Sequence, residues 1–302
     1  MKNGIYKAEN EWMSIAKSKN EIDKSGSCVT LVLFVNQTSY FVNVGDSRGI
    51  MSIKRGHIKK SVTEDHKPST DLESKRIYNA GGKIYRTRLP VFNFSMLEKA
   101  DSEEMESKLF GPFRVVPGKL SVSRTIGDIY AKEPILGGNP NVVVCEPDIF
   151  PKLIEKNDDF IILCSDGIFD LISTADVISL SWSVINKSLN KGTSSIHQLS
   201  KDCVEAIVVE AMKKKSSDNL TAIFIALPGL VDYCNEYWYP KENVNKSNLQ
   251  GNSSNLSKIL ENSNTGRSKT PSLINKSDSL QYSKLYPNHS RKVTPSLMGK
   301  KD

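Results

Sequence analysis

Residues 160–170 read F-I-I-L-C-S-D-G-I-F-D, and this stretch decides how the chain is interpreted. Its first five residues form an apolar run of strand length, which is typical of a buried strand. The run ends on Ser165, Asp166 and Gly167, so the expected strand delivers a carboxylate into a glycine turn. Two interpretations are open: Asp166 caps the helix that comes next, or it holds a metal ion.

Two further aspartates occupy the same kind of position. Asp46 follows the expected strand Y-F-V-N-V at 40–44, and Asp218 comes shortly before L-T-A-I-F-I-A-L at 220–227. An ionised carboxylate at a buried strand end costs several kcal/mol to desolvate unless it has a partner. Taken singly, each aspartate is explained as a cap or turn residue. Their shared placement favours a divalent cation as the common partner, and Mg²⁺ commonly binds a few carboxylates.

Histidine and cysteine usage argues against other kinds of site. The chain has 4 histidines, so a zinc-type site is not expected. Its 5 cysteines are odd in number and include no C-x-x-C pair, which indicates neither a disulfide framework nor a zinc site. Free cysteines fit a reducing compartment, and we expect neither a secretion signal nor a membrane span, because no apolar run approaches ~20 residues. The expected location is cytoplasmic or nuclear.

The apolar pattern predicts short antiparallel strands mixed with amphipathic helices. Strands are expected at 28–35, 40–44, 50–53, 142–145, 160–164 and 220–227. Helices are expected at 9–20, 70–80, 175–187 and 195–215. Residues 83–119 are expected to be irregular, as a mobile loop or flap. The predicted fold class is α+β: an antiparallel β-sandwich, with sheets packed face to face and helices outside.

The last part of the chain differs in composition from the rest. From about residue 239 it is rich in Asn, Ser and Lys, with scattered apolar residues, so we expect a folded domain at 1–238 and a disordered basic tail at 239–302. The tail holds 11 of the 41 basic and 4 of the 34 acidic residues, which accounts for the whole net charge of +7. A tail-mediated partner is possible in principle. Nucleic acid is not the expected partner, because the charges of the tail are dispersed rather than grouped in blocks.

Six motifs, in this order, carry a resemblance to a known family. They are V-G-D-S-R (44–48), T-E-D-H-K-P (63–68), E-S-K-R-I-Y-N-A-G-G (73–82), L-S-V-S-R-T-I-G-D (120–128), I-L-C-S-D-G-I-F-D (162–170) and S-D-N-L-T (217–221). Over about residues 25–227 the chain resembles the metal-dependent protein phosphatases of the PPM or PP2C type. The resemblance implies a β-sandwich flanked by helices, with two or more Mg²⁺ or Mn²⁺ ions at one edge. It also implies hydrolysis of phosphoserine and phosphothreonine in phosphoprotein substrates by metal-bound water.

The resemblance also assigns roles to individual aspartates. Asp166 and Asp218 match the metal aspartates of the family, and Asp46 matches the aspartate associated with a third, weaker metal. Asp170, one turn beyond Asp166, is expected to support the ligands rather than to bind an ion. No side chain is assigned as the nucleophile, since water bound to the ions would attack. A cysteine-dependent phosphatase is excluded because C-x5-R occurs at none of the cysteines.

Other conspicuous residues are interpreted as structural. Arg48 and Arg124 follow turn and strand signals, and either could reach phosphate, but pairing roles within the fold are favoured for both. His66, before Pro68, is expected in a surface loop. Arg76 is expected to pack the helix at 70–80. The residues that bind phosphate therefore remain unassigned.

One part of the family pattern is not found in this sequence. The family places an Asp-Gly-His-Gly-Gly segment ahead of the first motif seen here, and its aspartate bridges both ions. Two hypotheses follow from this difference. The chain is a metal-dependent phosphatase whose N-terminal portion lies outside the given sequence, or it is a catalytically inactive phosphatase-like domain that binds phosphoproteins or serves as a regulatory module. A third interpretation makes the basic tail a nucleic-acid binder.

Overall fold

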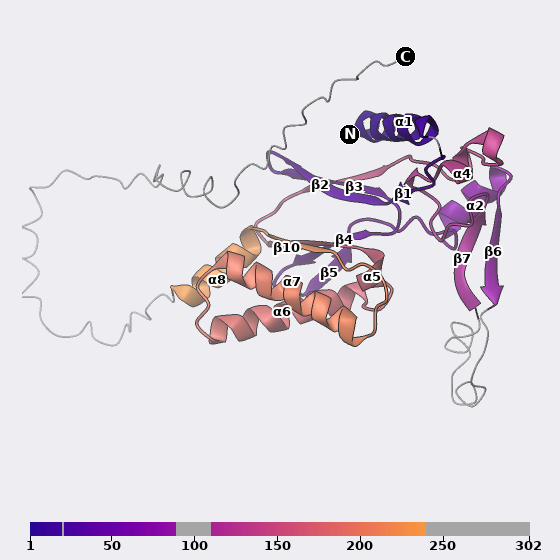
Figure 1. The fold of residues 1–302 in the computed structure, drawn as a ribbon. Coiled ribbons are helices and arrows are strands. Elements are labelled where there is room, and N and C mark those ends of the chain that lie inside the picture. Colours follow the sequence, from indigo (N-terminus) through magenta and orange to yellow (C-terminus); the bar gives the residue numbers. More distant parts are fainter. Residues whose placement is uncertain (20, 89–109, 240–302) are drawn as a thin grey trace, which may run out of the picture. The chain divides into compact units, whose positions relative to one another are not determined.

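The computed structural model describes residues 1–19, 21–88 and 110–239, and two antiparallel sheets form the centre of this part of the chain (Figure 1). The first sheet contains β4 (Arg48–Ile53), β5 (Ile58–Ser61), β10 (Asp158–Cys164) and β11 (Ala222–Ala226). Its strand order is β11-β10-β4-β5. The second sheet contains β2 (Val29–Val35), β3 (Thr38–Val44) and β9 (Asp148–Leu153), in the order β2-β3-β9.

A hydrophobic core lies between the two sheets. Phe41 of β3 packs there against Met51 of β4 and against Ile161 and Leu163 of β10. The alternate residues of β10 point to the opposite face and enter a second core. All seven residues of β10 are therefore buried, which explains why its sequence is a continuous apolar run rather than an alternating one.

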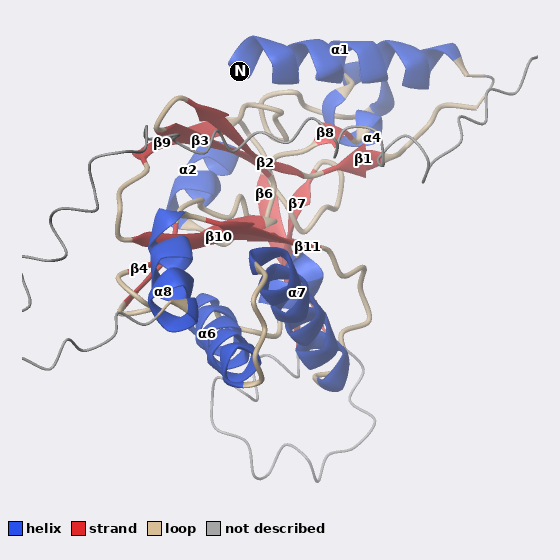
Figure 2. Ribbon diagram, turned by 90° about the vertical axis from the view of Figure 1, so that its left-hand side faces the viewer, coloured by secondary structure: helices blue, strands red, loops and turns tan. Residues whose placement is uncertain are grey.

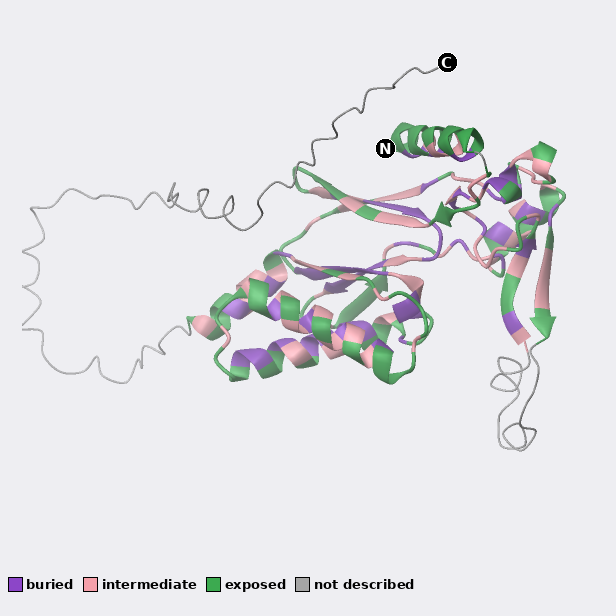
Figure 3. Ribbon diagram, viewed as in Figure 1, coloured by how far each residue is buried: buried purple, intermediate pink, exposed green. Residues whose placement is uncertain are grey.

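Three helices cover the outer face of the four-stranded sheet (Figure 2). They are α6 (Thr174–Asn190), α7 (Ile196–Lys213) and α8 (Pro228–Trp238). Their apolar sides pack with Phe160 and Ile162 of β10, and Figure 3 shows buried residues on the helix sides that face the sheet. Ser173 caps α6, because its hydroxyl accepts a hydrogen bond from the backbone N–H of Asp176 at 3.2 Å. The expected helices at 175–187 and 195–215 are confirmed.

A helix also covers the outer face of the three-stranded sheet. This helix, α1 (Lys2–Ser18), packs Ile5 against Val42 and Val44 of β3. Glu9 of α1 accepts hydrogen bonds from the N–H of Gly127 and from Lys132 Nζ, both at 2.7 Å. The helix begins earlier than the expected residue 9, because its buried side already starts at Ile5. The predicted sandwich flanked by helices is thus confirmed.

Smaller elements pack beside the sandwich. They are β1 (Gly26–Ser27), α2 (Asp71–Asn79), β6 (Lys83–Arg88), β7 (Phe110–Val116), β8 (Ile126–Gly127), α4 (Ile129–Lys132), the 3₁₀ helix η2 (Pro134–Leu136) and α5 (Asp166–Phe169). The capping-box helix corresponds to α2. The expectation of an irregular stretch at 83–119 is wrong at both ends, since β6 and β7 pair with each other there. Its middle, residues 89–109, lies outside the described residues.

Two expected strands also differ from the structure. Residues 142–145 form a turn and a bend, followed by an isolated β-bridge between Val144 and Arg124, rather than a strand. Val142 and Val143 are buried against α2 and β7 residues instead. The strand in this region is β9, which its Pro151 concealed in the sequence. A proline is tolerated because β9 is an edge strand of the described sheet, where one side needs no ladder donor.

One edge of β2 has no strand partner within the described residues. Leu31, Leu33, Phe34 and Val35 of this strand are all exposed. The predicted tail falls at 240–302 outside the described residues, so it stays a prediction. In the described ranges, no helix combines the length and the apolar character needed to cross a membrane.

Candidate functional site

The three predicted metal aspartates come to the same end of the four-stranded sheet. In the register of this sheet, the last residue of β10 lies opposite the first residues of β4 and β11. Asp166 follows β10 by two residues, Asp46 precedes β4 by two, and Asp218 precedes β11 by four. Antiparallel pairing therefore places all three where these strands begin or end.

Hydrogen bonds join the turn after β10 to the turn before β11. The Ser165 hydroxyl donates to the carbonyl of Asn219 at 3.0 Å and accepts from the N–H of Thr221 at 3.1 Å. Gly167 approaches the same segment so closely that an added Cβ would lie 2.6 Å from the Asn219 carbonyl oxygen. A side chain at Gly167 would push the two aspartate-bearing turns apart.

Asp166 is the first residue of α5, and Ser165 occupies the cap position without a side-chain capping bond. One carboxylate oxygen of Asp166 accepts only from the adjacent Gly167 N–H, at 2.9 Å. Asp218 makes the matching contact with its neighbour, accepting from the N–H of Asn219 at 2.7 Å. The interpretation of Asp166 as the helix cap is therefore wrong, and among the described residues neither carboxylate has a further hydrogen-bond or ion-pair partner.

Asp46 is buried with poor compensation for its charge. The residue is 5% exposed, and the thiol of Cys28 donates to its Oδ1 at 3.6 Å. The ammonium of Lys67 lies 3.9 Å from Oδ2. Burial, followed by the negative charge of Asp166, raises the pKa of Asp46 to about 6. Burial and the charge of Asp218 likewise raise the pKa of Asp166. A bound cation would offset the nearby negative charge that raises the pKa of Asp46 and of Asp166.

Basic side chains supply part of the missing positive charge. Lys67 pairs with Asp170 at 2.8 Å and lies 3.9 Å from Asp65. Arg48 holds Asp65 through two hydrogen bonds of 2.9 and 2.7 Å, so its pairing role agrees with the structural interpretation. These pairs bring a lysine and an arginine beside the aspartates, a neighbourhood that suits an anionic group.

The negative charges act on one another in pairs, since Asp166 raises the pKa of Asp46 and Asp218 raises that of Asp166. Among the residues that the structure describes, no group of three or more His, Cys, Asp or Glu side chains is arranged to hold a metal ion. The donor chemistry still fits a hard divalent cation, because Asp46, Asp166 and Asp218 offer only oxygen ligands. The carboxylate of Asp46 is the least compensated of them.

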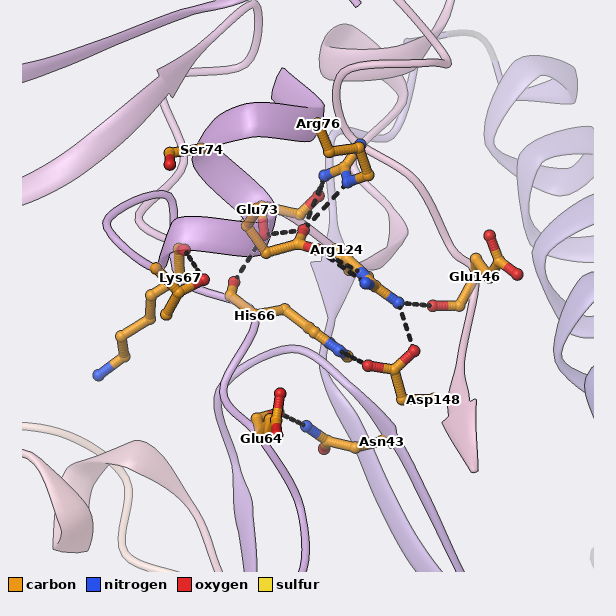
Figure 4. A network of polar contacts seen from close by, with 12 residues as sticks. Asn43, Glu64, His66, Lys67, Glu73, Ser74, Arg76, Arg124, Glu146 and Asp148 are labelled. Carbon is orange, nitrogen blue, oxygen red and sulfur yellow. Dashed lines mark hydrogen bonds and ion pairs between the residues drawn. The ribbon is translucent and has the colours of Figure 1, made fainter. Parts of the chain in front are cut away.

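Behind the Asp46 turn lies a buried polar network (Figure 4). His66 is 2% exposed, so its expected place in a surface loop is wrong. Its ring contacts Gly45 on one side and Asp148 on the other, each at 3.0 Å. Arg124 joins Asp148 at 2.9 Å to Glu73 at 2.7 Å, in line with its expected pairing role. Sequence reasoning missed the position of His66, although its motif T-E-D-H-K-P was among those that carried the family resemblance.

Glu73 is the hub of this network and shows how a buried carboxylate is normally satisfied. It accepts hydrogen bonds from Arg124, from Arg76 and, at 2.5 Å, from the Ser123 hydroxyl. Burial alone would raise its pKa, but these donors lower the pKa to about 2. Arg76 thus packs α2 to its surroundings as expected, and it also donates to the carbonyl oxygen of Asn141 at 2.9 Å.

Comparison with solved structures agrees with this architecture. The chain is similar to a Caenorhabditis elegans sex determining protein, with a TM-score of 0.57 and 20% identity, over 78% of this chain and 48% of that one. It is also similar to the serine-threonine phosphatase 2C of Toxoplasma gondii, with a TM-score of 0.52 and 20% identity, over 74% of this chain and 65% of that one. The fold is therefore that of a PP2C-type protein phosphatase.

Sequence comparison gives the same result. The family model of Protein phosphatase 2C matches residues 1–220. Human Protein phosphatase 1A is 30% identical over 230 residues, which cover 76% of this chain and 50% of the relative. Protein phosphatase ppm-1.A of Caenorhabditis elegans is 28% identical over 231 residues, covering 76% and 41%. The chain belongs to the protein phosphatase 2C family, whose members depend on metal ions, and it spans about half the length of these curated relatives.

Proposed function

We propose that this chain acts in metal-dependent hydrolysis of phosphoserine and phosphothreonine in protein substrates. The observation that carries the proposal is the position of Asp46 beside Asp166. Asp46 is buried, lacks a strong hydrogen-bond donor, and lies close enough to Asp166 for their charges to interact. Family membership makes the phosphoester of a protein the natural substrate class.

The residues that would hold the ions are Asp166, Asp218 and Asp46, and Mg²⁺ or Mn²⁺ would suit their oxygen donors. Two or more such ions, when bound, supply an activated water and neutralise the charge of the phosphoryl group. Lys67 lies 3.9 Å from Asp46 and would keep positive charge beside the ligands. Asp170 fixes Lys67 in that place through their 2.8 Å contact.

The cysteines offer no competing nucleophile. Burial raises the pKa of Cys28, Cys164 and Cys203 to about 12, and that of Cys234 to about 11. The pKa of Cys145 is raised by burial as well. All five side chains are therefore thiols near neutral pH rather than reactive thiolates.

The test is release of phosphate from a phosphothreonine peptide by purified residues 1–302 in millimolar Mn²⁺. We expect slow, Mn²⁺-dependent release, because the bridging aspartate of the family pattern is not in this sequence. Asp166→Ala should remove most of the remaining rate, since the elements of such a site act as a unit. Glu205→Gln, an exposed carboxylate change on α7, is the matched control and should leave the rate unchanged.

Two other outcomes are informative. Release that persists in Asp166→Ala would contradict the proposal. Binding of the phosphopeptide with no release, in wild type as in Asp166→Ala, would favour the alternative of a phosphoprotein-binding regulatory module. Fluorescence anisotropy of a labelled peptide measures that binding directly.

A further inference from the structure

The imidazole of His66 is clamped between the turn that carries Asp46 and the partly exposed carboxylate of Asp148. The backbone N–H of Gly45 donates to His66 Nδ1 at 3.0 Å. The other ring nitrogen, Nε2, lies 3.0 Å from Asp148 Oδ2. Since a backbone N–H can only donate, Nδ1 must act as the acceptor, and the ring proton is on Nε2, facing Asp148. The contacts on both sides therefore define one tautomer of the ring.

We propose that His66 is a positioning residue that fixes the backbone of Gly45 on both sides of its Cα and thereby the place of Asp46 in the metal site. This inference rests on the proposed function, because it treats Asp46 as a ligand. It adds a residue that does not touch the ions and that acts through the backbone of its neighbour.

The Gly45 peptide is held from several directions. His66 binds it twice, since its own N–H also donates to the Gly45 carbonyl at 2.9 Å. The amide of Asn43 donates to the same carbonyl at 3.0 Å. Gly45 has φ +110°, and an added Cβ would lie 2.2 Å from Cys28 Sγ, so the turn closes against Cys28, the residue directly before β2, and leaves no room for a side chain.

The backbone contacts matter because the Asp46 side chain has little of its own to fix it. Its closest polar contacts are a thiol at 3.6 Å and an ammonium at 3.9 Å. A ligand carboxylate must be held within a few tenths of an ångström of its productive place. The orientation of Asp46 must therefore come from the backbone of Gly45 before it, whose N–H donates to the His66 ring and whose carbonyl accepts from the His66 N–H.

Asp148 is held in turn by the network behind it. Arg124 Nη1 donates to Asp148 Oδ1 at 2.9 Å and pairs with the buried Glu73. The hydrogen bond from His66 and the charge of Arg124 lower the pKa of Asp148 to about 2, although burial opposes this shift. Asp148 is therefore a carboxylate at any ordinary pH, and it keeps the imidazole proton on Nε2 and away from Gly45.

Two substitutions of His66 each keep the contact of one ring nitrogen and remove that of the other. In His66→Asn the amide oxygen can take the place of Nδ1 and accept from Gly45. In His66→Gln the amide reaches toward the place of Nε2, so that the contact with Asp148 is kept and the contact with Gly45 is lost. His57→Gln, in the exposed turn between β4 and β5, is the control.

The readouts are Mn²⁺ affinity, followed by the electron paramagnetic resonance signal of free Mn²⁺, and hydrogen exchange of the Gly45 amide by NMR. We expect His66→Gln to weaken Mn²⁺ binding on the order of 10- to 100-fold, the usual cost of losing a supporting partner of a metal ligand. The Gly45 amide should then exchange faster. His66→Asn should keep both properties within about threefold of wild type, with a similar thermal midpoint for the two variants.

Asp148→Asn is an independent way to remove the hydrogen bond between the Gly45 N–H and His66 Nδ1. With its oxygen facing Arg124, the new amide would donate to Nε2 and move the ring proton to Nδ1, where it opposes the Gly45 N–H. We expect the ¹⁵N shifts of the imidazole to report the exchanged tautomer, and Mn²⁺ affinity to fall as in His66→Gln. If a His66 variant does not fold, Asp148→Asn tests whether His66 positions Asp46.

Equal Mn²⁺ affinities in His66→Asn and His66→Gln would overturn the inference, as would unchanged Gly45 exchange in His66→Gln. If wild-type protein binds no Mn²⁺, the proposed function fails. The Gly45 exchange rates then still decide whether His66 fixes this turn, so the two failures are distinguishable.

Discussion

Asp46 and Glu73 are both buried carboxylates, 5% and 2% exposed, yet the structure treats them in opposite ways. Glu73 accepts from two arginines and a serine, and its pKa falls to about 2. Asp46 has a thiol and a distant lysine, and its pKa rises to about 6. Burial is nearly equal, so the partners decide the sign of the shift. Glu73 is a completed ion-pair network, whereas Asp46 is a carboxylate that still lacks a cation.

The largest effect should follow from removing the charge of Glu73. Glu73→Gln leaves Arg76 and Arg124 without their shared buried countercharge. Breaking such a pair costs about 3–5 kcal/mol of the free energy of unfolding. Urea denaturation measures the change, and Glu205→Gln should stay within about 0.5 kcal/mol of wild type. A small loss in Glu73→Gln would show that the network contributes less than its hydrogen bonds indicate.

Asp46→Asn should increase the free energy of unfolding of the metal-free protein at pH 7, whereas Glu73→Gln decreases it. The folded-state pKa is raised from 3.8 to about 6, so folding favours the protonated form of Asp46. Stability from this group is therefore greatest below pH 4 and is lost as the pH rises to about 6. A shift of about two pKa units corresponds to about 3 kcal/mol, which Asn, always neutral, should restore at pH 7.

The measurement is the difference in free energy of unfolding between Asp46→Asn and wild type, taken at pH 4 and at pH 7 in chelator. The difference should favour the variant at pH 7 and nearly vanish at pH 4. A variant that is less stable than wild type at pH 7 would show that the Asp46 charge is already compensated.

Addition of Mn²⁺ should stabilise the wild-type chain. A ligand that binds only the folded state adds about 2.7 kcal/mol when its concentration is 100 times the dissociation constant. Asp46→Asn should gain less, because one candidate ligand is weakened, and the control Glu205→Gln should gain as much as wild type. Thermal midpoints at a series of Mn²⁺ concentrations test this, and equal gains in all three proteins would separate Asp46 from metal binding.

The smallest effect is expected for Lys67→Met. Lys67 is partly exposed and lies 3.9 Å from Asp46, so its contribution to stability should stay below about 1 kcal/mol. Its charge lowers the pKa of Asp46, and its removal should therefore raise that pKa further. The ¹³C shift of the Asp46 carboxyl during a pH titration reports the change. An unchanged titration would mean that the lysine does not act on Asp46.

Much of the sandwich could be predicted because its central strands have simple patterns. The run that forms β10 is apolar throughout, since both of its faces are covered. The β6–β7 pair was missed because strands such as Lys83–Arg88 carry polar and charged residues at most positions. Residues 142–145 have the composition of a strand, but tertiary packing of Val142 and Val143 against α2 and β7 overrides that preference.

The candidate site was predictable only in part. Asp46, Asp166 and Asp218 share a placement at strand ends, which can be read along the chain. The position of His66 depends on contacts with Gly45 and Asp148, 21 and 82 residues away in the sequence. The local sequence does not reveal such long-range contacts. The neighbours Lys67 and Pro68 therefore predict a surface loop, although His66 is buried.

The edge of β2 that has no strand partner among the described residues has a practical consequence for all of these measurements. This strand exposes four apolar side chains, those of Leu31, Leu33, Phe34 and Val35, of which Leu33 is 45% and Val35 46% exposed. It carries no charged residue that would discourage pairing with another strand. Two copies of the chain can therefore join edge to edge as the protein concentration rises. Unfolding midpoints would then depend on concentration, because association stabilises the folded state by mass action. Free energies that compare variants consequently need a dilution series, extrapolated to the monomer.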